Sequence, residues 1–292
     1  MGVHTVRCIQ RKVSNLYFCS FFKGFQQGCS TAMSKRRAVS TAESKKKRRK
    51  VANDDLALGN ESSKSNKVTT LVEKVGRELR KNADPERSQP MKKYMRDKFE
   101  FFGLSSPLRR SVCREFLQQK LSPQETRKFV ALLWAKPERE FQYFAVDYLE
   151  KHMDTSAEFE ANIECVKGLI ISKSWWDTVD TLASKIVGGL VRKHRDVGKN
   201  VMEEWIDHEN MWLRRTAILH QLSYKEETDE EVLFRFCSLR AGEEEFFIRK
   251  AIGWALRQYA WTSSSSVKKY LLKHKKELSG LSFKEAAKHL NL

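Results

Sequence analysis

The sequence predicts an all-α protein built as a curved array of antiparallel helix pairs, from about residue 67 to residue 292. Apolar residues recur at helical spacing in one short segment after another, and the alternating pattern typical of strands is absent. The links are short, as in antiparallel helix pairs. The expected helices are roughly 68–82, 88–98, 108–120, 123–134, 138–152, 157–171, 175–194, 198–207, 210–222, 228–240, 244–260, 264–276 and 282–290.

Several of these segments carry helix start signals. In Ser122–Pro123 and Lys136–Pro137 a proline stands at or near the first helical turn, where its missing N–H is not needed. In Ser174–Asp177 and Ser282–Glu285 a serine precedes an acidic residue by three positions, a pattern typical of an N-cap with an acidic first turn. We therefore expect the serines of the last two segments to be N-caps.

The succession of short helices indicates a solenoid of helix pairs with a period of about 35–45 residues. Self-similarity is weak and is exemplified by Phe141–Val146 and Trp212–Ala217. A degenerate HEAT-like array is the favoured interpretation, and an irregular helical bundle is the alternative. A curved array would offer a concave surface wide enough for a nucleic-acid duplex.

Residues 1–66 lack sustained hydrophobic periodicity and are rich in Ser, Lys and Arg, which predicts a disordered targeting tail. The basic run Lys45–Val51 is typical of a nuclear localisation signal. The first 42 residues contain no acidic residue, which is also compatible with a mitochondrial presequence. A start at Met33 would remove the presequence-like signal and keep the basic run Lys45–Val51.

The charge of the chain favours a polyanionic partner. Lys and Arg total 55 against 37 Asp and Glu, for a net charge of +18. Residues 1–67 carry +11 of this and the remaining residues +7, so the helical part is itself basic. Nucleic acid is the expected partner, because each phosphate contact releases condensed counterions. A solvated basic surface is the alternative, and no apolar run approaches the ~18 residues of a membrane span.

The cysteines and histidines predict neither a metal site nor disulfide bonds. The six cysteines form no CxxC pair, and the seven histidines form no HxH or HxxxH unit. Cys113, Cys165 and Cys237 stand in apolar helical contexts, which predicts buried thiols and a reducing compartment.

The segment Ser174–Asp180 carries a candidate site. On a helix Trp176 and Asp180 are four residues apart and share one face. A carboxylate beside a large aromatic residue is costly to bury unless it has a cationic partner. The alternative is a structural role, with the tryptophan in the core and the aspartate at its rim.

The segment Phe246–Arg257 places Lys250, Trp254 and Arg257 on one helix face, opposite an apolar face. A stripe of cation, aromatic and cation indicates a surface for phosphate and sugar. A half-buried Trp254 with no binding role is the alternative.

Two further segments mix aromatic and basic residues. In Trp212–Ala217 the core positions leave one arginine of the pair Arg214 and Arg215 directed at a partner, where its planar fork suits phosphate. Tyr94–Gly103 has the same mixed character.

In order and without large insertions, the chain from about residue 68 to residue 292 resembles the AlkD family of DNA alkylation-repair glycosylases. The resemblance is carried by Tyr94–Gly103, Ser174–Asp180, Trp212–Ala217 and Phe246–Arg257. It implies a HEAT-like solenoid with a concave, basic, DNA-binding surface. It also implies a monofunctional glycosylase that excises cationic alkylated purines without flipping the base. The basic extension over residues 1–66 departs from compact bacterial members and suggests a eukaryotic-type member.

The resemblance also implies residue roles. The implied catalytic residues are Asp180, Trp176 and Trp254. The expected DNA-contacting residues are Arg215, Arg257 and Tyr94 from the resemblance, and Lys250 and Arg214 from residue spacing. The expected partner is double-stranded DNA containing alkylated bases, bound by a monomer without a cofactor or metal.

The main alternative is a non-catalytic HEAT-like scaffold that binds nucleic acid or protein. It accounts for the helices and the charge, but it gives Asp180 no task, because a carboxylate in a basic groove weakens phosphate binding. A nuclease is disfavoured, because the sequence offers no carboxylate cluster for Mg²⁺.

Overall fold

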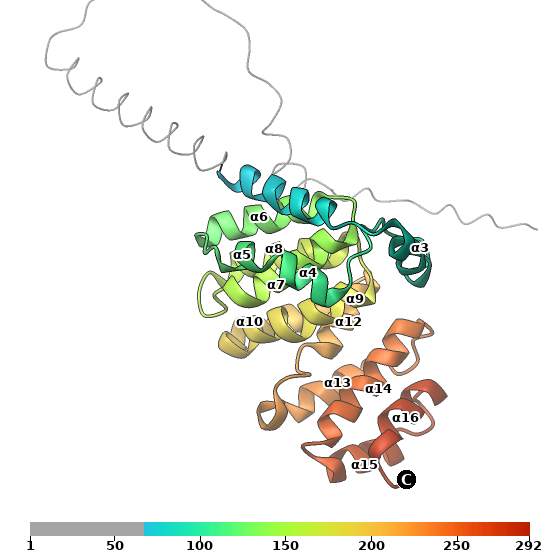
Figure 1. Ribbon diagram of the computed structural model, residues 1–292. Coiled ribbons are helices and arrows are strands. Elements are labelled where there is room, and N and C mark those ends of the chain that lie inside the picture. Colours follow the sequence, from blue (N-terminus) through green and yellow to red (C-terminus); the bar gives the residue numbers. More distant parts are fainter. Residues whose placement is uncertain (1–66) are drawn as a thin grey trace, which may run out of the picture. The chain divides into compact units, whose positions relative to one another are not determined.

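The computed structural model describes residues 67–292, which lie within one compact unit, Gly59–Leu292 (Figure 1). These residues are helical and contain no β-strand, although an isolated bridge pairs Glu100 with Glu138. The predicted all-α fold is therefore confirmed. The tail predicted for residues 1–66, with Lys45–Val51 and Met33, lies outside the described residues, and the domain boundary stays a prediction.

The first helix covers residues 67–81. It is followed by α3 (Pro85–Tyr94), α4 (Ser106–Val112), α5 (Arg114–Gln118), α6 (Pro123–Ala135), α7 (Arg139–His152), α8 (Phe159–Ile171) and α9 (Trp176–Thr181). Next come η2 (Leu182–Val187), α10 (Gly188–Lys193), α11 (Arg195–Ile206), α12 (Met211–Leu219) and η3 (Lys225–Glu227). The last elements are α13 (Glu230–Leu239), α14 (Phe246–Ala260), α15 (Ser264–Lys273), α16 (Gly280–Ala286) and η4 (Ala287–His289).

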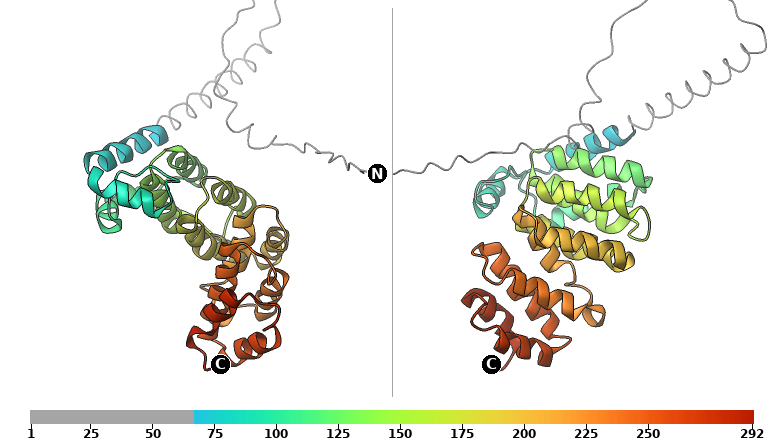
Figure 2. Two further views of the ribbon diagram at one scale, coloured as in Figure 1. Left: turned by 90° about the vertical axis from the view of Figure 1, so that its right-hand side faces the viewer. Right: turned by 180° about the vertical axis from the view of Figure 1, so that it is seen from behind.

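Successive helices pack in layers along a bent row within this unit (Figure 2). Neighbours in the chain pair closely, as in α6 with α7 and α11 with α12, and α12 also packs on α14. One apolar core runs through the layers from Val68 to Ala286, as expected when each helix pair can bury its apolar face only against the next pair. The arrangement is that of a helical solenoid.

Ion pairs join neighbouring layers, and their residues lie 28 to 38 positions apart in the sequence. Arg109 with Asp147 and Arg139 with Asp177 are both 38 residues apart. Asp180 with Arg215 and Lys250 with Glu285 are both 35 residues apart. These four spacings lie within the predicted repeat period, whereas the pair of Arg214 with Glu243, 29 residues apart, is shorter.

Most helix boundaries follow from local chemistry. Ser122 and Glu125 form a reciprocal capping box with Pro123 at the first position of α6, as predicted. The helix expected over 88–98 is instead α3, which ends at Tyr94, because Arg96 and Asp97 both take left-handed backbone angles (φ 55°). The segment expected over 108–120 is divided into α4 and α5 at Cys113.

Two of the predicted N-caps are wrong. The hydroxyl of Ser174 donates to the carbonyl of Ile170, and Trp175 is the capping residue of α9. At the C-terminal end, Ser279 caps α16 by accepting from the N–H of Ser282. The hydroxyl of Ser282 instead donates to the carbonyl of Arg249 on α14, so in neither segment did the serine-to-acid spacing mark a cap.

The helix that carries the candidate site is continuous but not uniform. The segment expected over 175–194 is formed by α9, η2 and α10, and η2 is a π-helical turn that begins two residues after Asp180. Such turns are frequent at functional sites. At Gly188 a Cβ would lie 2.3 Å from the carbonyl oxygen of His220, so only glycine allows this close approach to the end of α12.

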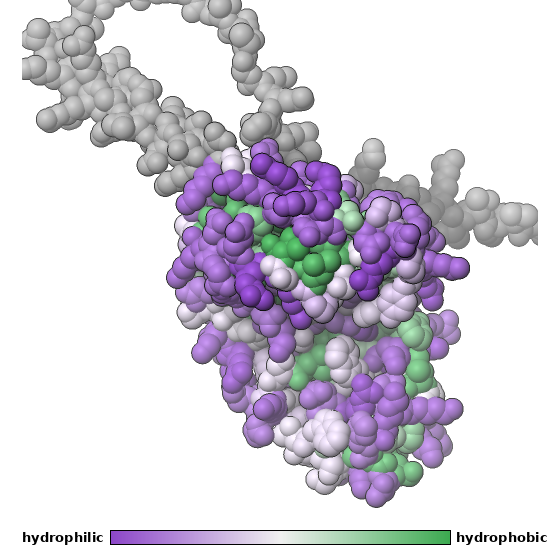
Figure 3. All heavy atoms as spheres, in the orientation of Figure 1, coloured by the Kyte–Doolittle hydropathy of each residue, from purple (hydrophilic) through white to green (hydrophobic). Residues whose placement is uncertain are grey.

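The face drawn in Figure 3 is mainly hydrophilic, with smaller apolar patches. Within residues 67–292 none of the helices combines the length and apolarity needed to cross a bilayer. Cys113 and Cys237 are buried free thiols, as predicted, whereas Cys165 is only half-buried. Burial raises the pKa of all three thiols, that of Cys165 to about 11, and so favours their protonated form.

Candidate functional site

Asp180 on α9 is bound by Arg215 on α12 in a two-point ion pair. The Nε of Arg215 lies 2.8 Å from Oδ1 of Asp180, and its Nη2 lies 2.9 Å from Oδ2. The remaining terminal nitrogen of Arg215 donates to the carbonyl of Phe247 at the start of α14. The arginine side chain is 5% exposed and the aspartate side chain 17%. The carboxylate is therefore held through both oxygens and remains partly exposed.

The environment of Asp180 affects its protonation in opposing ways. Burial raises the pKa of this carboxyl above its usual value, the hydrogen bonds and charge of Arg215 lower it, and the nearby charge of Asp177 raises it. The net direction is upward. Arg215 is thus the group that favours the ionised form of Asp180 in a site that otherwise disfavours it.

Trp176 and Asp180 share one face of α9, as predicted. The helix begins at Trp176 because the preceding residue, Trp175, is extended (φ −159°, ψ 157°). The ring of Tyr94 stands edge-on to that of Trp176, with centroids 6.3 Å apart and planes at 79°. Tyr94 is 71% exposed. The two rings therefore form an accessible aromatic edge on the side of Asp180.

The first turn of α9 is fixed by a buried network around Asp177. Arg139 of α7, which is fully buried, donates to both oxygens of Asp177 at 3.0 and 2.7 Å. The hydroxyl of Tyr143 donates to the same carboxylate at 2.7 Å. Arg139 also stacks on Phe99, with 3.8 Å from its Cζ to the ring centroid. The network ties the segment after α3 to the helix that carries Trp176.

A cluster of mainly aromatic side chains lies next to the Asp177 network, which it meets at Phe99. The sequence alone did not indicate this cluster. It consists of Met95, Phe99 and Trp175, packed against Phe101, Trp176, Trp212 and Phe247. The centroid of the Phe247 ring is 5.1 Å from that of Trp175 and 5.0 Å from that of Trp212. The Nζ of Lys98 lies 4.8 Å from the centroid of the Trp175 ring. Because the cluster joins α9, α12 and α14, it fixes the relative positions of the helices that carry the candidate residues.

On α14, Lys250, Trp254 and Arg257 lie on one face, as the spacing predicted. Trp254 is half-buried against the main core. Lys250 and Arg257 both bind Glu285 of α16, the lysine with 2.6 Å from Nζ to Oε2. The sequence interpretation took Glu285 for a first-turn residue of its helix and so missed its position beside these cations.

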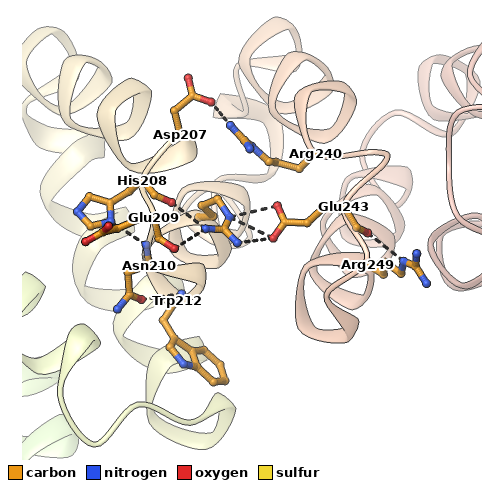
Figure 4. A network of polar contacts seen from close by, with 9 residues as sticks. Asp207, His208, Glu209, Asn210, Trp212, Arg240, Glu243 and Arg249 are labelled. Carbon is orange, nitrogen blue, oxygen red and sulfur yellow. Dashed lines mark hydrogen bonds and ion pairs between the residues drawn. The ribbon is translucent and has the colours of Figure 1, made fainter. Parts of the chain in front are cut away.

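Arg214, next to Arg215 in the chain, is held by oxygens of His208, Glu209 and Glu243, the partners that Figure 4 labels. Its Nε lies 3.1 Å from both carboxylate oxygens of Glu243, and its Nη1 donates to the carbonyls of His208 and Glu209 at 2.8 Å. These bonds link the loop before α12 to the segment before α14. The guanidinium is engaged within the protein, whereas the sequence predicted that one of the two arginines faces a partner.

The structure brings the predicted site residues together in three groups. Asp180 meets Arg215, Trp176 meets Tyr94, and Lys250 meets Arg257 through a shared carboxylate. Trp254 lies between Lys250 and Arg257 along α14. Among the ring pairs within residues 67–292, Trp176 pairs with Tyr94 and not with Trp254.

The position of Arg215 differs from the predicted phosphate contact. Its guanidinium lies beneath the surface and is already bound by Asp180 and by the carbonyl of Phe247, so it is placed to orient the carboxylate. Among the described residues no group of three His, Cys, Asp or Glu side chains is arranged to hold a metal ion.

Comparison with known proteins gives a consistent result. Residues 75–290 match the family model described as DNA alkylation repair enzyme. The fold is similar to a solved structure described as a predicted DNA alkylation repair enzyme from Enterococcus faecalis, with a TM-score of 0.66 and 31% identity, covering 72% of this chain and 97% of that chain. The comparison with curated proteins gave no match.

Proposed function

The chain belongs to the family of DNA alkylation repair enzymes, and from that premise we propose that it is a DNA glycosylase. Its substrates are cationic alkylated purines such as 3-methyladenine and 7-methylguanine in duplex DNA. It hydrolyses their N-glycosidic bonds and so initiates base excision repair, without flipping the base. The observation that carries this proposal is the partly exposed carboxylate of Asp180, held through both oxygens by Arg215 on the helix that begins at Trp176.

The leaving base needs little help from the protein in this reaction. An alkylated purine already bears a positive charge, so it takes the electron pair of the breaking bond and leaves as a neutral base. The deoxyribose becomes cationic at C1′ as the bond breaks. The oxygen of a water molecule then bonds to C1′, and its proton passes to a base.

We assign two roles at the sugar to Asp180. Its carboxylate stabilises the developing positive charge and accepts the proton of the attacking water. The faces of Trp176 and Trp254 pack against the sugar, because aromatic faces attract a cation. Arg215 is a positioning residue in this scheme. It holds both oxygens of Asp180 and favours the ionised form of the carboxyl, because its hydrogen bonds and charge lower the pKa that burial raises.

Release of free base without metal is the test of this function. Purified protein incubated with methylated duplex DNA and EDTA is expected to release 3-methyladenine and 7-methylguanine, which chromatography would detect. Tight DNA binding without base release would instead support a non-catalytic scaffold. Strand cleavage that EDTA abolishes would support a nuclease.

Replacing Arg215 with Lys is expected to move the acid limb of the pH–rate profile to higher pH. Lysine keeps a positive charge but loses the two-point fork, so it lowers the pKa of Asp180 less than arginine does. Because the reaction needs the ionised carboxylate, activity falls as the pH drops through that pKa. Single-turnover base release measured from mildly acidic to neutral pH checks this.

The matched control for this variant is Arg214→Lys, in which the neighbouring arginine, bound to Glu243, is changed in the same way. Its acid limb should coincide with that of the wild type. An unshifted acid limb in Arg215→Lys would contradict the role assigned to Arg215.

We also propose that the protein acts in the nucleus as a monomer on double-stranded DNA, with a mitochondrial form as the alternative. The basic run Lys45–Val51 supports nuclear import, although it lies outside the described residues. Imaging of tagged forms that begin at Met1 and at Met33 tests this.

A further inference from the structure

One buried carboxylate near the C-terminus binds three cations. The side chain of Glu285 is 6% exposed. Its Oε2 lies 2.6 Å from Nζ of Lys250, and its Oε1 lies 3.0 Å from Nζ of Lys288 and also accepts from Arg257. Two of the cations come from α14 and the third from η4, so a single carboxylate gathers basic groups from two elements.

The position of Glu285 is fixed by the packing of α16 on α14. At Gly253 a Cβ would lie 2.5 Å from the Cβ of Glu285, so the two helices approach more closely than another residue would allow. The hydroxyl of Ser282 donates to the carbonyl of Arg249 at 2.9 Å, which adds a polar link between the same helices. Glu285 is therefore a rigid anchor.

The cluster has more positive than negative charge. One carboxylate faces three cations, and burial together with the charges of Lys288, Arg257 and Arg215 lowers the pKa of Lys250. The cations remain accessible, with side-chain exposures of 35% for Lys250, 23% for Arg257 and 53% for Lys288. Accessible cations that repel one another around a fixed carboxylate form a surface that an anion would stabilise.

The cluster also lies next to the proposed active site. Lys250 and Arg257 stand on either side of Trp254 along α14, and their charged ends converge on the two oxygens of Glu285. Lys288 binds the same carboxylate, so the three cations form a compact group. Such a group can bind the oxygens of one backbone phosphate of DNA next to Trp254.

We propose that Glu285 is a positioning residue that holds Lys250, Arg257 and Lys288 as one site for a backbone phosphate of DNA. Within this site, Lys288 contacts the phosphate together with the two cations of α14. The inference rests on the proposed function, because it places this phosphate on the strand that Trp254 contacts.

A purely neutralising role for Glu285 leads to the opposite expectation. If the carboxylate only offset positive charge, Glu285→Gln would tighten DNA binding and leave base excision unchanged. If it positions the cations, the variant keeps its affinity at low salt but excises the base about tenfold more slowly, since a misplacement of about 1 Å can reduce the rate by a factor of about 10².

The experiment measures binding of the full chain to fluorescent duplex DNA over a range of salt concentrations, and single-turnover release of 7-methylguanine. Lys288→Ala is expected to reduce the slope of log affinity against log salt by about one. Lys284→Ala is the matched control, because it removes another exposed lysine, on α16, that is not among the cations bound to Glu285. It should leave the slope unchanged.

Two results support the proposal together: slower excision by Glu285→Gln with its low-salt affinity retained, and the reduced slope of Lys288→Ala. An excision rate at the wild-type level in Glu285→Gln, or a wild-type slope in Lys288→Ala, overturns it. Thermal unfolding shows whether Glu285→Gln is folded. Because Lys288 is exposed, Lys288→Ala is expected to fold normally, and its salt dependence tests the site even if Glu285→Gln unfolds. If the wild type releases no base, the proposed function fails, and the salt slopes alone decide the phosphate site.

Discussion

Replacing Asp180 with Asn is expected to slow the release of 7-methylguanine from methylated duplex DNA by about 10²–10³-fold, while DNA binding stays close to that of the wild type. Asparagine keeps the size of the side chain and one oxygen that can accept from Arg215. It removes the negative charge that stabilises the cationic sugar and the base that accepts the proton of water. Single-turnover release and fluorescence anisotropy measure the two quantities separately.

The control for this prediction is Glu243→Gln, which makes the same chemical change in another carboxylate bound by an arginine. Glu243 pairs with Arg214, and their side chains are 16% and 14% exposed, close to the partly buried state of Asp180. The control should keep its excision rate. Unchanged release of 7-methylguanine by Asp180→Asn would rule out the catalytic role of this carboxylate.

Replacing Arg139 with Met is expected to lower the free energy of unfolding by about 3–5 kcal/mol, because the substitution leaves the buried carboxylate of Asp177 without its cation. For a protein of this size that corresponds to a fall in Tm of about 10 °C. The side chains of Arg139 and Asp177 are 0% and 6% exposed, so water screens the loss poorly. Thermal unfolding followed by circular dichroism measures it.

Two comparisons show whether charge burial is the cause. The double variant Arg139→Met with Asp177→Asn should recover part of the lost stability, because it also removes the unpaired charge. Arg192→Met changes an arginine paired with Glu227 on the exposed surface, where both side chains are more than 40% exposed, and should leave Tm unchanged. A double variant that is less stable than Arg139→Met would contradict this account.

Local features of the fold could be predicted from the sequence to a large extent. Apolar spacing located the helices, and the capping box at Ser122 marked the start of α6 correctly. The errors occurred where local signals compete. The serines at 174 and 282 bond to groups other than those a cap would satisfy, and two left-handed residues after Tyr94 end a helix that the apolar pattern would continue.

The helix faces of the candidate site could be predicted from the sequence, but the contacts between them could not. The faces that carry Trp176, Asp180 and Trp254 follow from helical spacing. The pairing of Asp180 with Arg215 joins residues 35 apart, and its geometry depends on how two layers stack. The same holds for Glu285, which in sequence is an ordinary acidic residue of a short helix. Both pairings, Asp180 with Arg215 and Glu285 with Lys250, join residues 35 apart, so a known repeat length would have indicated them.

The ion pairs between layers also connect the candidate site to the stability of the array. A buried arginine joins two layers by binding a carboxylate at Arg109–Asp147 and at Arg139–Asp177. The pair of Arg215 and Asp180 is a contact of the same kind, and its carboxylate is partly exposed. Under the proposed function, the contact that positions Asp180 for the reaction also holds two layers together. A substitution that removes this pair is therefore expected to lower both the stability of the array and the rate of excision.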